Sequence, residues 1–167
     1  MSGVDEFNRM SERQRMHVLF GVCSSTIWAR RVLAGGPFPD AAALLDRADR
    51  VLAELPDAEI DAALDGHPRI GARADNPSSA REQARVADAA AEVKTALADR
   101  NREYEDRFGY VYLVCASGRT AEELLAILTE RLGNDPETER RVMRNELAKI
   151  NRLRLERLLA SPGRLEG

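Results

Sequence analysis

A histidine in an unusual setting is the first residue of this sequence that could do chemistry. His67 stands within residues 66–71, Gly-His-Pro-Arg-Ile-Gly, where glycine and proline predict a constrained loop outside any helix. Imidazole titrates near neutral pH, so a positioned His67 can give or take a proton. The alternative is a loop histidine that only hydrogen-bonds a backbone carbonyl. The second histidine, His17, lies in a segment with helical spacing and is interpreted as structural.

A carboxylate follows this loop, at the start of the next predicted helix. Ser79, Glu82 and Gln83 stand in the order Ser-x-x-Glu-Gln, which is also the form of a capping box for the first helical turn. A helix start presents free N–H groups and a partial positive charge, which suit an anionic ligand. There, Glu82 can accept hydrogen bonds from ligand N–H groups, and Gln83 can both donate and accept. The helix cap and the ligand site are compatible, and the sequence leaves both open.

The last predicted helix carries several arginines among leucines. A solvated basic face is the simplest interpretation of Arg152, Arg154 and Arg157. Arg154, however, lies between Leu153 and Leu155 in an apolar stretch. A guanidinium there can bind a carboxylate through two parallel hydrogen bonds, so Arg154 is a second candidate binding residue.

The elements that would position these residues are helices joined by short turns. Capping boxes begin at Ser11 and Thr120, Asp40 is a predicted N-cap, and Asp135 precedes a proline at the first helical position. This pattern predicts one all-α domain over residues 1–167, a bundle of about seven or eight helices. The expected helices cover about 11–23, 27–34, 41–55, 57–65, 79–107, 120–132 and 135–160, with a loop at 66–78.

One short segment does not follow the helical pattern. Residues 108–115 combine valine, leucine and tyrosine, which favour strands. Periodicity over so few residues does not separate an extended segment from the start of a buried helix. Both interpretations therefore stay open.

Composition and charge exclude several classes of protein. The net charge of −3 gives no electrostatic basis for binding nucleic acid, and no apolar run approaches transmembrane length. Cys23 and Cys115 lie in separate apolar runs and are expected to be buried reduced thiols, and no cysteine–histidine spacing typical of a metal site occurs. The polar first ten residues are unlike a signal peptide, and the last residues are not a peroxisomal signal. We therefore expect a cytoplasmic protein that does not bind membranes.

Five motifs follow one another along the chain. They are His-Pro-Arg-Ile-Gly at 67–71, Ser-x-x-Glu-Gln at 79–83, Asn-x-x-Tyr-x-x-x-Phe-Gly-Tyr at 101–110, Arg-Leu-Gly-Asn at 131–134 and Ile-x-x-Leu-Arg-Leu at 150–155. An early Phe-Asn pair at 7–8 and a Cys-x-Ser-x-x-Trp pattern at 23–28 precede them. Together these motifs resemble those of one enzyme family, the OHCU decarboxylases, which act on 2-oxo-4-hydroxy-4-carboxy-5-ureidoimidazoline (OHCU). The resemblance covers about residues 5–160.

The resemblance implies an all-α decarboxylase that needs no cofactor or metal and converts a small ureide, OHCU, to (S)-allantoin, the last step from urate. It implies that His67 is the catalytic acid and that Glu82 also acts in catalysis. It places Arg154 at the substrate carboxyl group, with Arg157 as the alternative. It also implies that a segment near residues 114–118 contacts the substrate through its backbone. The other residues that it implies in substrate binding are therefore Pro68, Ser79, Gln83, Val114, Cys115, Ala116, Ser117 and Gly118.

Two other functions remain open at this point. A non-enzymatic helical interaction module would explain the caps and the amphipathic helices, although not a constrained histidine loop beside a helix start. A different ureide decarboxylase or a ureide hydrolase would explain both. Exposed leucines on a helix face would also allow a homodimer.

Overall fold

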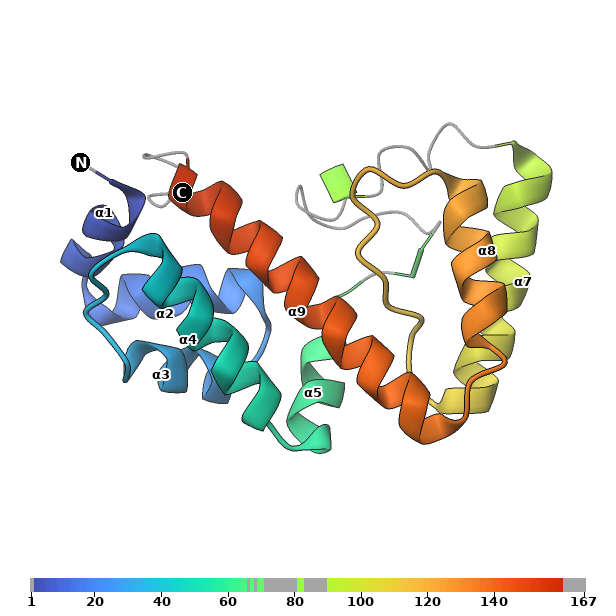
Figure 1. Cartoon of the computed structure of the whole chain (residues 1–167), viewed down its shortest axis with the longest axis horizontal. Helices are drawn as coiled ribbons and strands as arrows, with labels where there is room; N and C mark the ends of the chain where they lie inside the picture. The colour runs from blue at the N-terminus through green and yellow to red at the C-terminus, as the bar shows by residue number, and fades with distance from the viewer. Residues whose placement is uncertain (1, 66, 68, 71–80, 83–89, 161–167) are drawn as a thin grey trace. The chain divides into compact units, whose positions relative to one another are not determined.

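A computed structural model describes residues 2–65, 67, 69–70, 81–82 and 90–160. Within these residues the structure contains eight helices and no strand, which confirms the all-α prediction (Figure 1). Contacts divide the chain into two compact units, residues 1–66 with 148–167 and residues 67–147. The single domain over 1–167 therefore stays a prediction. No described helix is long and apolar enough to cross a membrane.

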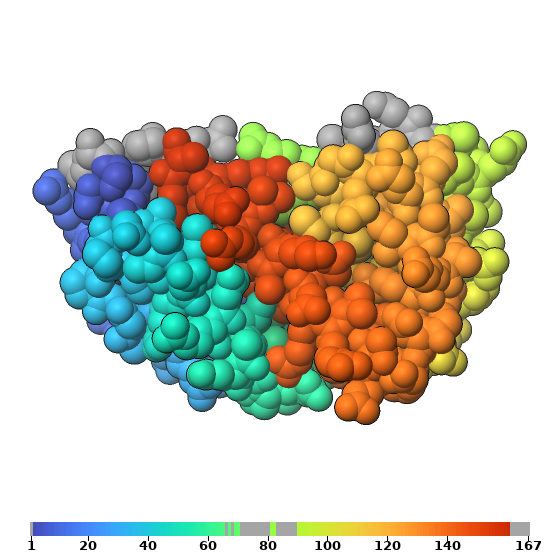
Figure 2. Space-filling view, in the orientation of Figure 1, coloured from blue at the N-terminus to red at the C-terminus, as the bar shows by residue number. Residues whose placement is uncertain are grey.

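The first unit contains the second part of α9 (Pro136–Ala160) and five shorter helices. The five are α1 (Gly3–Arg9), α2 (Glu12–Val22), α3 (Thr26–Leu33), α4 (Ala41–Glu54) and α5 (Asp57–Leu64). The core of this unit includes Trp28, whose indole Nε1 donates to the carbonyl of Ala48 at 3.2 Å and so joins α3 to α4. The second part of α9 also pairs with α4, because Arg152 Nη1 lies 2.8 Å from Asp49 Oδ2. These two helices lie side by side at the surface in Figure 2.

The second unit is built on α7 (Ala91–Phe108) and α8 (Ala121–Arg131), which pack against each other (Figure 1). It also contains the first part of α9 (Pro136–Ala160). Gly109 ends α7 with φ 83°, a left-handed conformation that glycine adopts without strain. Its core cluster is formed by Ile70, Leu97, Tyr104, Tyr112, Val114, Ala116, Ala121, Leu124 and Leu128.

The predicted helix starts at three caps are confirmed. The side chains of Ser11, Asp40 and Thr120 accept hydrogen bonds from the third backbone N–H group of α2, α4 and α8, respectively. Residues 109–120 form neither helix nor strand. Of the two interpretations of 108–115, the extended segment is therefore the correct one for the residues after Phe108.

Two expectations for the helices were wrong or incomplete. The helix α1, which Ser2 and Asp5 cap through a capping box, was not predicted. The helix expected over 79–107 is not continuous, because Ala90 has an extended conformation and α7 begins after it. Alanine favours helix wherever it stands, so an alanine-rich run does not show where a helix breaks.

The two cysteines are free thiols, Cys23 buried and Cys115 partly buried. Burial raises the pKa of Cys23 to about 11. A thiol with such a pKa stays protonated at neutral pH, so Cys23 behaves as an apolar core residue.

Candidate functional site

The loop that carries His67 is tied to α7 in the second unit. His67 is partly exposed, and the side chain of the buried Ile70 lies in the core of this unit. The amide Nδ2 of Asn101 donates to the carbonyl of Ile70 at 3.3 Å and to that of Leu97 at 2.7 Å. Because one buried amide bonds both the loop and its own helix, Asn101 fixes the backbone three residues after His67.

An ion pair makes a second connection between this loop and α7. Arg69 donates from Nε to Glu105 Oε1 at 2.6 Å and from Nη2 to Oε2 at 3.1 Å. The hydrogen bond to Glu105 raises the pKa of Arg69 above its ordinary value. Glu105 lies one helical turn after Asn101, so both connections come from one face of α7. Two parallel hydrogen bonds between a guanidinium and a carboxylate restrict the orientation of both groups more than a single hydrogen bond does.

Glu82 is helical and buried, with 8% of its surface exposed. Carboxylates are rarely buried to this extent unless they are paired or hydrogen-bonded, so Glu82 differs from an ordinary solvated acid at a helix start. Three residues expected beside it or beside His67 lie outside the described residues, namely Pro68, Ser79 and Gln83. The capping box of Ser79 and Glu82 therefore stays a prediction.

The segment expected to face the substrate with its backbone, residues 114–118, lies in the same unit. Val114 and Ala116 are buried, whereas Cys115 and Ser117 are partly exposed, the alternation of an extended chain. Gly118 ends the segment with φ 78°. Val114 and Ala116 belong to the same core cluster as Ile70. One core thus supports both the histidine loop and this segment.

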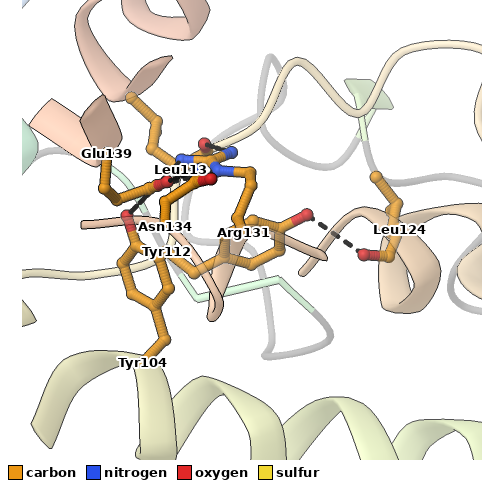
Figure 3. Close-up of polar contacts among 7 residues, drawn as sticks. All are labelled: Tyr104, Tyr112, Leu113, Leu124, Arg131, Asn134 and Glu139. Atoms are coloured by element: carbon orange, nitrogen blue, oxygen red, sulfur yellow. Dashed lines mark hydrogen bonds and ion pairs between the residues drawn. The ribbon is translucent and has the colours of Figure 1, made fainter. Parts of the chain in front are cut away.

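Leu113, the residue that precedes this segment, contacts a buried network centred on the ion pair of Arg131 and Glu139 (Figure 3). Arg131, at the end of α8, donates from Nε and Nη2 to Oε1 of Glu139 at 2.8 and 2.5 Å. The hydroxyl of Tyr104 donates to the same oxygen, and Asn134 Nδ2 donates to Oε2 at 3.0 Å. The side chains of Arg131 and Glu139 are 5% and 0% exposed. The remaining terminal nitrogen of the guanidinium, Nη1, donates to the carbonyl of Leu113 at 2.6 Å.

Two tyrosines enclose this ion pair. The guanidinium carbon of Arg131 lies 4.9 Å from the ring centre of Tyr112 and 5.7 Å from that of Tyr104. Burial, followed by the hydrogen bond to Glu139, raises the pKa of Tyr104, so its hydroxyl remains a donor. Burial also raises the pKa of Tyr112, whose hydroxyl donates to the carbonyl of Leu124 at 3.0 Å (Figure 3). Cation–π contact adds to the hydrogen bonds in holding the guanidinium plane.

Arg154 belongs to the first unit, so its part in the site stays a prediction. It is only 8% exposed, and its Nη1 donates to the carbonyl of Val22 at 3.0 Å. The solvated basic face is therefore the wrong interpretation for Arg154. Arg152 does pair with acids at the surface, and Arg157 is partly exposed. Within the described residues, no group of three His, Cys, Asp or Glu side chains is arranged to hold a metal ion.

Glu139 was not predicted as a functional residue from the sequence. It lies in the first turn of α9, where an acidic residue is ordinary, and it follows Arg131 by eight positions across a turn. No helical spacing connects such a pair. Arg131, Tyr104 and Asn134 were recognised only as residues of the family motifs. The sequence did not show that their side chains lie close together in space.

Solved structures with the same architecture define the class of protein. A crystal structure of OHCU decarboxylase in the presence of (S)-allantoin matches with a TM-score of 0.77 and 27% identity, over 85% of this chain and 96% of that chain. A crystal structure of (S)-allantoin synthase matches in fold, with a TM-score of 0.75 and 16% identity, over 93% of this chain and 54% of that chain. The fold is thus that of an all-α carboxy-lyase.

The sequence comparisons define the family. The family model for OHCU decarboxylase matches residues 8–156, and the chain belongs to this family. The uric acid degradation bifunctional protein TTL of Arabidopsis thaliana is 30% identical over 152 residues, 86% of this chain and 47% of that protein. The 2-oxo-4-hydroxy-4-carboxy-5-ureidoimidazoline decarboxylase of Amia calva is 42% identical over 62 residues, 37% of this chain and 35% of that protein. The matches span half or less of these two relatives.

Proposed function

We propose that this protein decarboxylates 2-oxo-4-hydroxy-4-carboxy-5-ureidoimidazoline to (S)-allantoin, the step that completes the conversion of urate to allantoin. The observation that carries the proposal is the match of the family model over residues 8–156. The shared core beneath the His67 loop and residues 114–118 supports it, because a reaction site needs both on a rigid base.

The chemistry suits side chains and backbone without an electron-accepting cofactor. The bond between a ring carbon and the carboxyl group breaks, CO₂ leaves, and the electron pair passes into the conjugated ring. A proton then adds to one face of the ring. The protein has to orient the carboxyl group, stabilise the negative charge that develops on the ring, and deliver that proton from one side.

Each of these tasks has a proposed residue. His67 donates the proton, and backbone N–H groups of residues 114–118 stabilise the developing charge. Glu82 accepts hydrogen bonds from the N–H groups of the ureido substituent or the ring. Pro68, Ser79 and Gln83 complete the substrate contacts. Arg154 binds the carboxyl group, with Arg157 as the alternative.

Enantioselective turnover without added cofactor tests this function. OHCU is made freshly by hydrolysis of 5-hydroxyisourate and mixed with chelator-treated protein, while circular dichroism follows the product. We expect faster decay of OHCU and one enantiomer of allantoin, whereas spontaneous decay gives both. Decay at the spontaneous rate would favour a helical interaction module or an enzyme for another ureide. Turnover that disappears on chelation and returns with metal would contradict the cofactor-free reaction.

Two further parts of the proposal concern the oligomeric state and the cellular location of the enzyme. We propose a homodimer, which sedimentation would distinguish from a monomer, and a cytoplasmic location, which fractionation of the source cells would test.

Glu82→Gln is expected to lower kcat/KM about 30- to 1000-fold with little change in melting temperature. If Glu82 only caps the helix, the glutamine amide still accepts the hydrogen bond at the helix start. If Glu82 accepts hydrogen bonds from the ligand, the amide lacks the charge and presents an N–H donor to the N–H donor of the ligand. This costs about 2–4 kcal/mol of transition-state binding free energy. Steady-state kinetics and thermal unfolding measure the two effects.

Glu123→Gln is the matched control for this variant. Glu123 occupies the same position after Thr120 in the exposed cap of α8, where its N–H donates to the threonine hydroxyl at 3.2 Å. The control is expected to keep both kcat/KM and melting temperature. Parental kcat/KM in Glu82→Gln would leave Glu82 without a role in the reaction.

A further inference from the structure

The segment that leads into the proposed substrate contacts has no regular secondary structure. Residues 109–120 belong to neither a helix nor a strand, so no ladder of backbone hydrogen bonds fixes their position. Side-chain hydrogen bonds connect this segment to the rest of the second unit at two points. Tyr112 bonds the carbonyl of Leu124, and Arg131 bonds the carbonyl of Leu113. The second bond is to the peptide group that joins Leu113 to Val114.

The geometry around Arg131 directs this hydrogen bond. Two of its three guanidinium nitrogens are held by Glu139, and the rings of Tyr104 and Tyr112 lie against the guanidinium. Guanidinium is planar, so fixing two nitrogens also fixes the direction of the third. That third nitrogen, Nη1, is the one that donates to Leu113 (Figure 3).

We propose that Arg131, oriented by Glu139, is a positioning residue for the decarboxylation. It holds the Leu113–Val114 peptide group in place, so that the backbone N–H groups of residues 114–118 keep the direction needed to stabilise the charge on the substrate ring. The inference rests on the proposed function. Its physical basis is that preorganised donors lose much of their effect when they shift, and a misplacement of about 1 Å can cost about 10²-fold in rate.

An ion pair that served stability alone would not need this arrangement. Buried ion pairs contribute little net stability compared with well-packed apolar side chains, because both charges lose their hydration. Arg131 supplies what an apolar side chain does not, a directed donor for the carbonyl of Leu113. Its burial also removes water as a competitor for that carbonyl.

Arg131→Lys tests the proposal, because lysine keeps the positive charge but lacks the planar fork. Its single nitrogen does not reproduce the bonds to Glu139 and Leu113 with the same geometry. We expect kcat to fall about 10- to 100-fold with KM within about threefold, the pattern of an interaction lost mainly in the transition state. Amide hydrogen exchange at residues 114–118 is expected to speed up at least tenfold.

Tyr104→Phe is the matched control. It removes the hydroxyl that bonds Glu139 but leaves the bond from Arg131 to Leu113, so it weakens the same network without releasing the segment. We expect a lower melting temperature with parental kcat and parental exchange at residues 114–118. If Tyr104→Phe lowers kcat as much as Arg131→Lys does, the network acts through stability alone and the proposal is overturned.

Glu139→Gln gives the same test if Arg131→Lys does not fold. The neutral amide accepts fewer charge-assisted bonds and orients Arg131 less tightly, so kcat is expected to fall about three- to tenfold with faster exchange at Val114. Parental kcat and exchange in the folded variant would overturn the proposal. A parent protein inactive on OHCU would overturn the proposed function as well, whereas an active parent with an unaltered Arg131→Lys variant would overturn only the positioning role.

Discussion

His67→Asn is expected to lower the rate of OHCU decarboxylation by roughly 10²–10⁴-fold, the usual contribution of a positioned general acid. Asparagine keeps a polar side chain of moderate size but does not donate a proton as an acid near neutral pH. The product should also lose its enantiomeric excess, because protonation by water is not restricted to one face. Kinetics and circular dichroism of the product measure both effects.

The second histidine provides the control for this prediction. His17 lies exposed on α2, so His17→Asn is expected to keep the parental rate and product. Because His67 is a loop residue, its variant should unfold at nearly the parental temperature. A folded His67→Asn protein within about threefold of the parental rate would end the assignment of His67 as the acid. An unfolded one would indicate a structural role.

Glu139→Ala is expected to lower the free energy of unfolding by about 3–5 kcal/mol, the usual cost of removing one partner from a buried ion pair. The substitution leaves the buried guanidinium of Arg131 without its counter-charge. It also leaves Tyr104 and Asn134 without their acceptor. Urea denaturation followed by circular dichroism measures the change.

A neighbouring glutamate gives the comparison. Glu137 lies exposed in the same first turn of α9, so Glu137→Ala is expected to change the free energy of unfolding by less than about 1 kcal/mol. Glu139→Gln should fall between the two, because it keeps an acceptor but loses the charge. Equal effects of Glu137→Ala and Glu139→Ala on the free energy of unfolding would show that the buried ion pair contributes no more to stability than an exposed glutamate does.

Much of the helical architecture could be predicted from residues close together in the chain. The caps at Ser11, Asp40 and Thr120 begin helices where the sequence analysis placed them. A cap depends on a side chain and an N–H group three residues apart, so local sequence contains nearly all the information. Where the signal is absent, as at Ala90, the prediction failed, because an alanine-rich run favours helix on both sides of the break.

The residues of the candidate site also fall into those that nearby sequence indicates and those that it does not. His67 and Glu82 were recognisable from their immediate neighbours, a constrained loop and a helix start. The support beneath them was not, since Asn101 and Glu105 contact the loop from about thirty residues away. Glu139 had no local signal at all.

The sequence by itself thus determined the all-α class, the family motifs and the residue types available for chemistry. Only the tertiary structure decided which motif letters form the buried ion-pair network and which residues hold the loop. The physical reason is that helix caps and turns are short-range, whereas the partner of a buried charge is whichever group the packed core brings within hydrogen-bond distance. For Arg131 these partners are a carboxylate on the next helix and a carbonyl eighteen residues earlier in the chain.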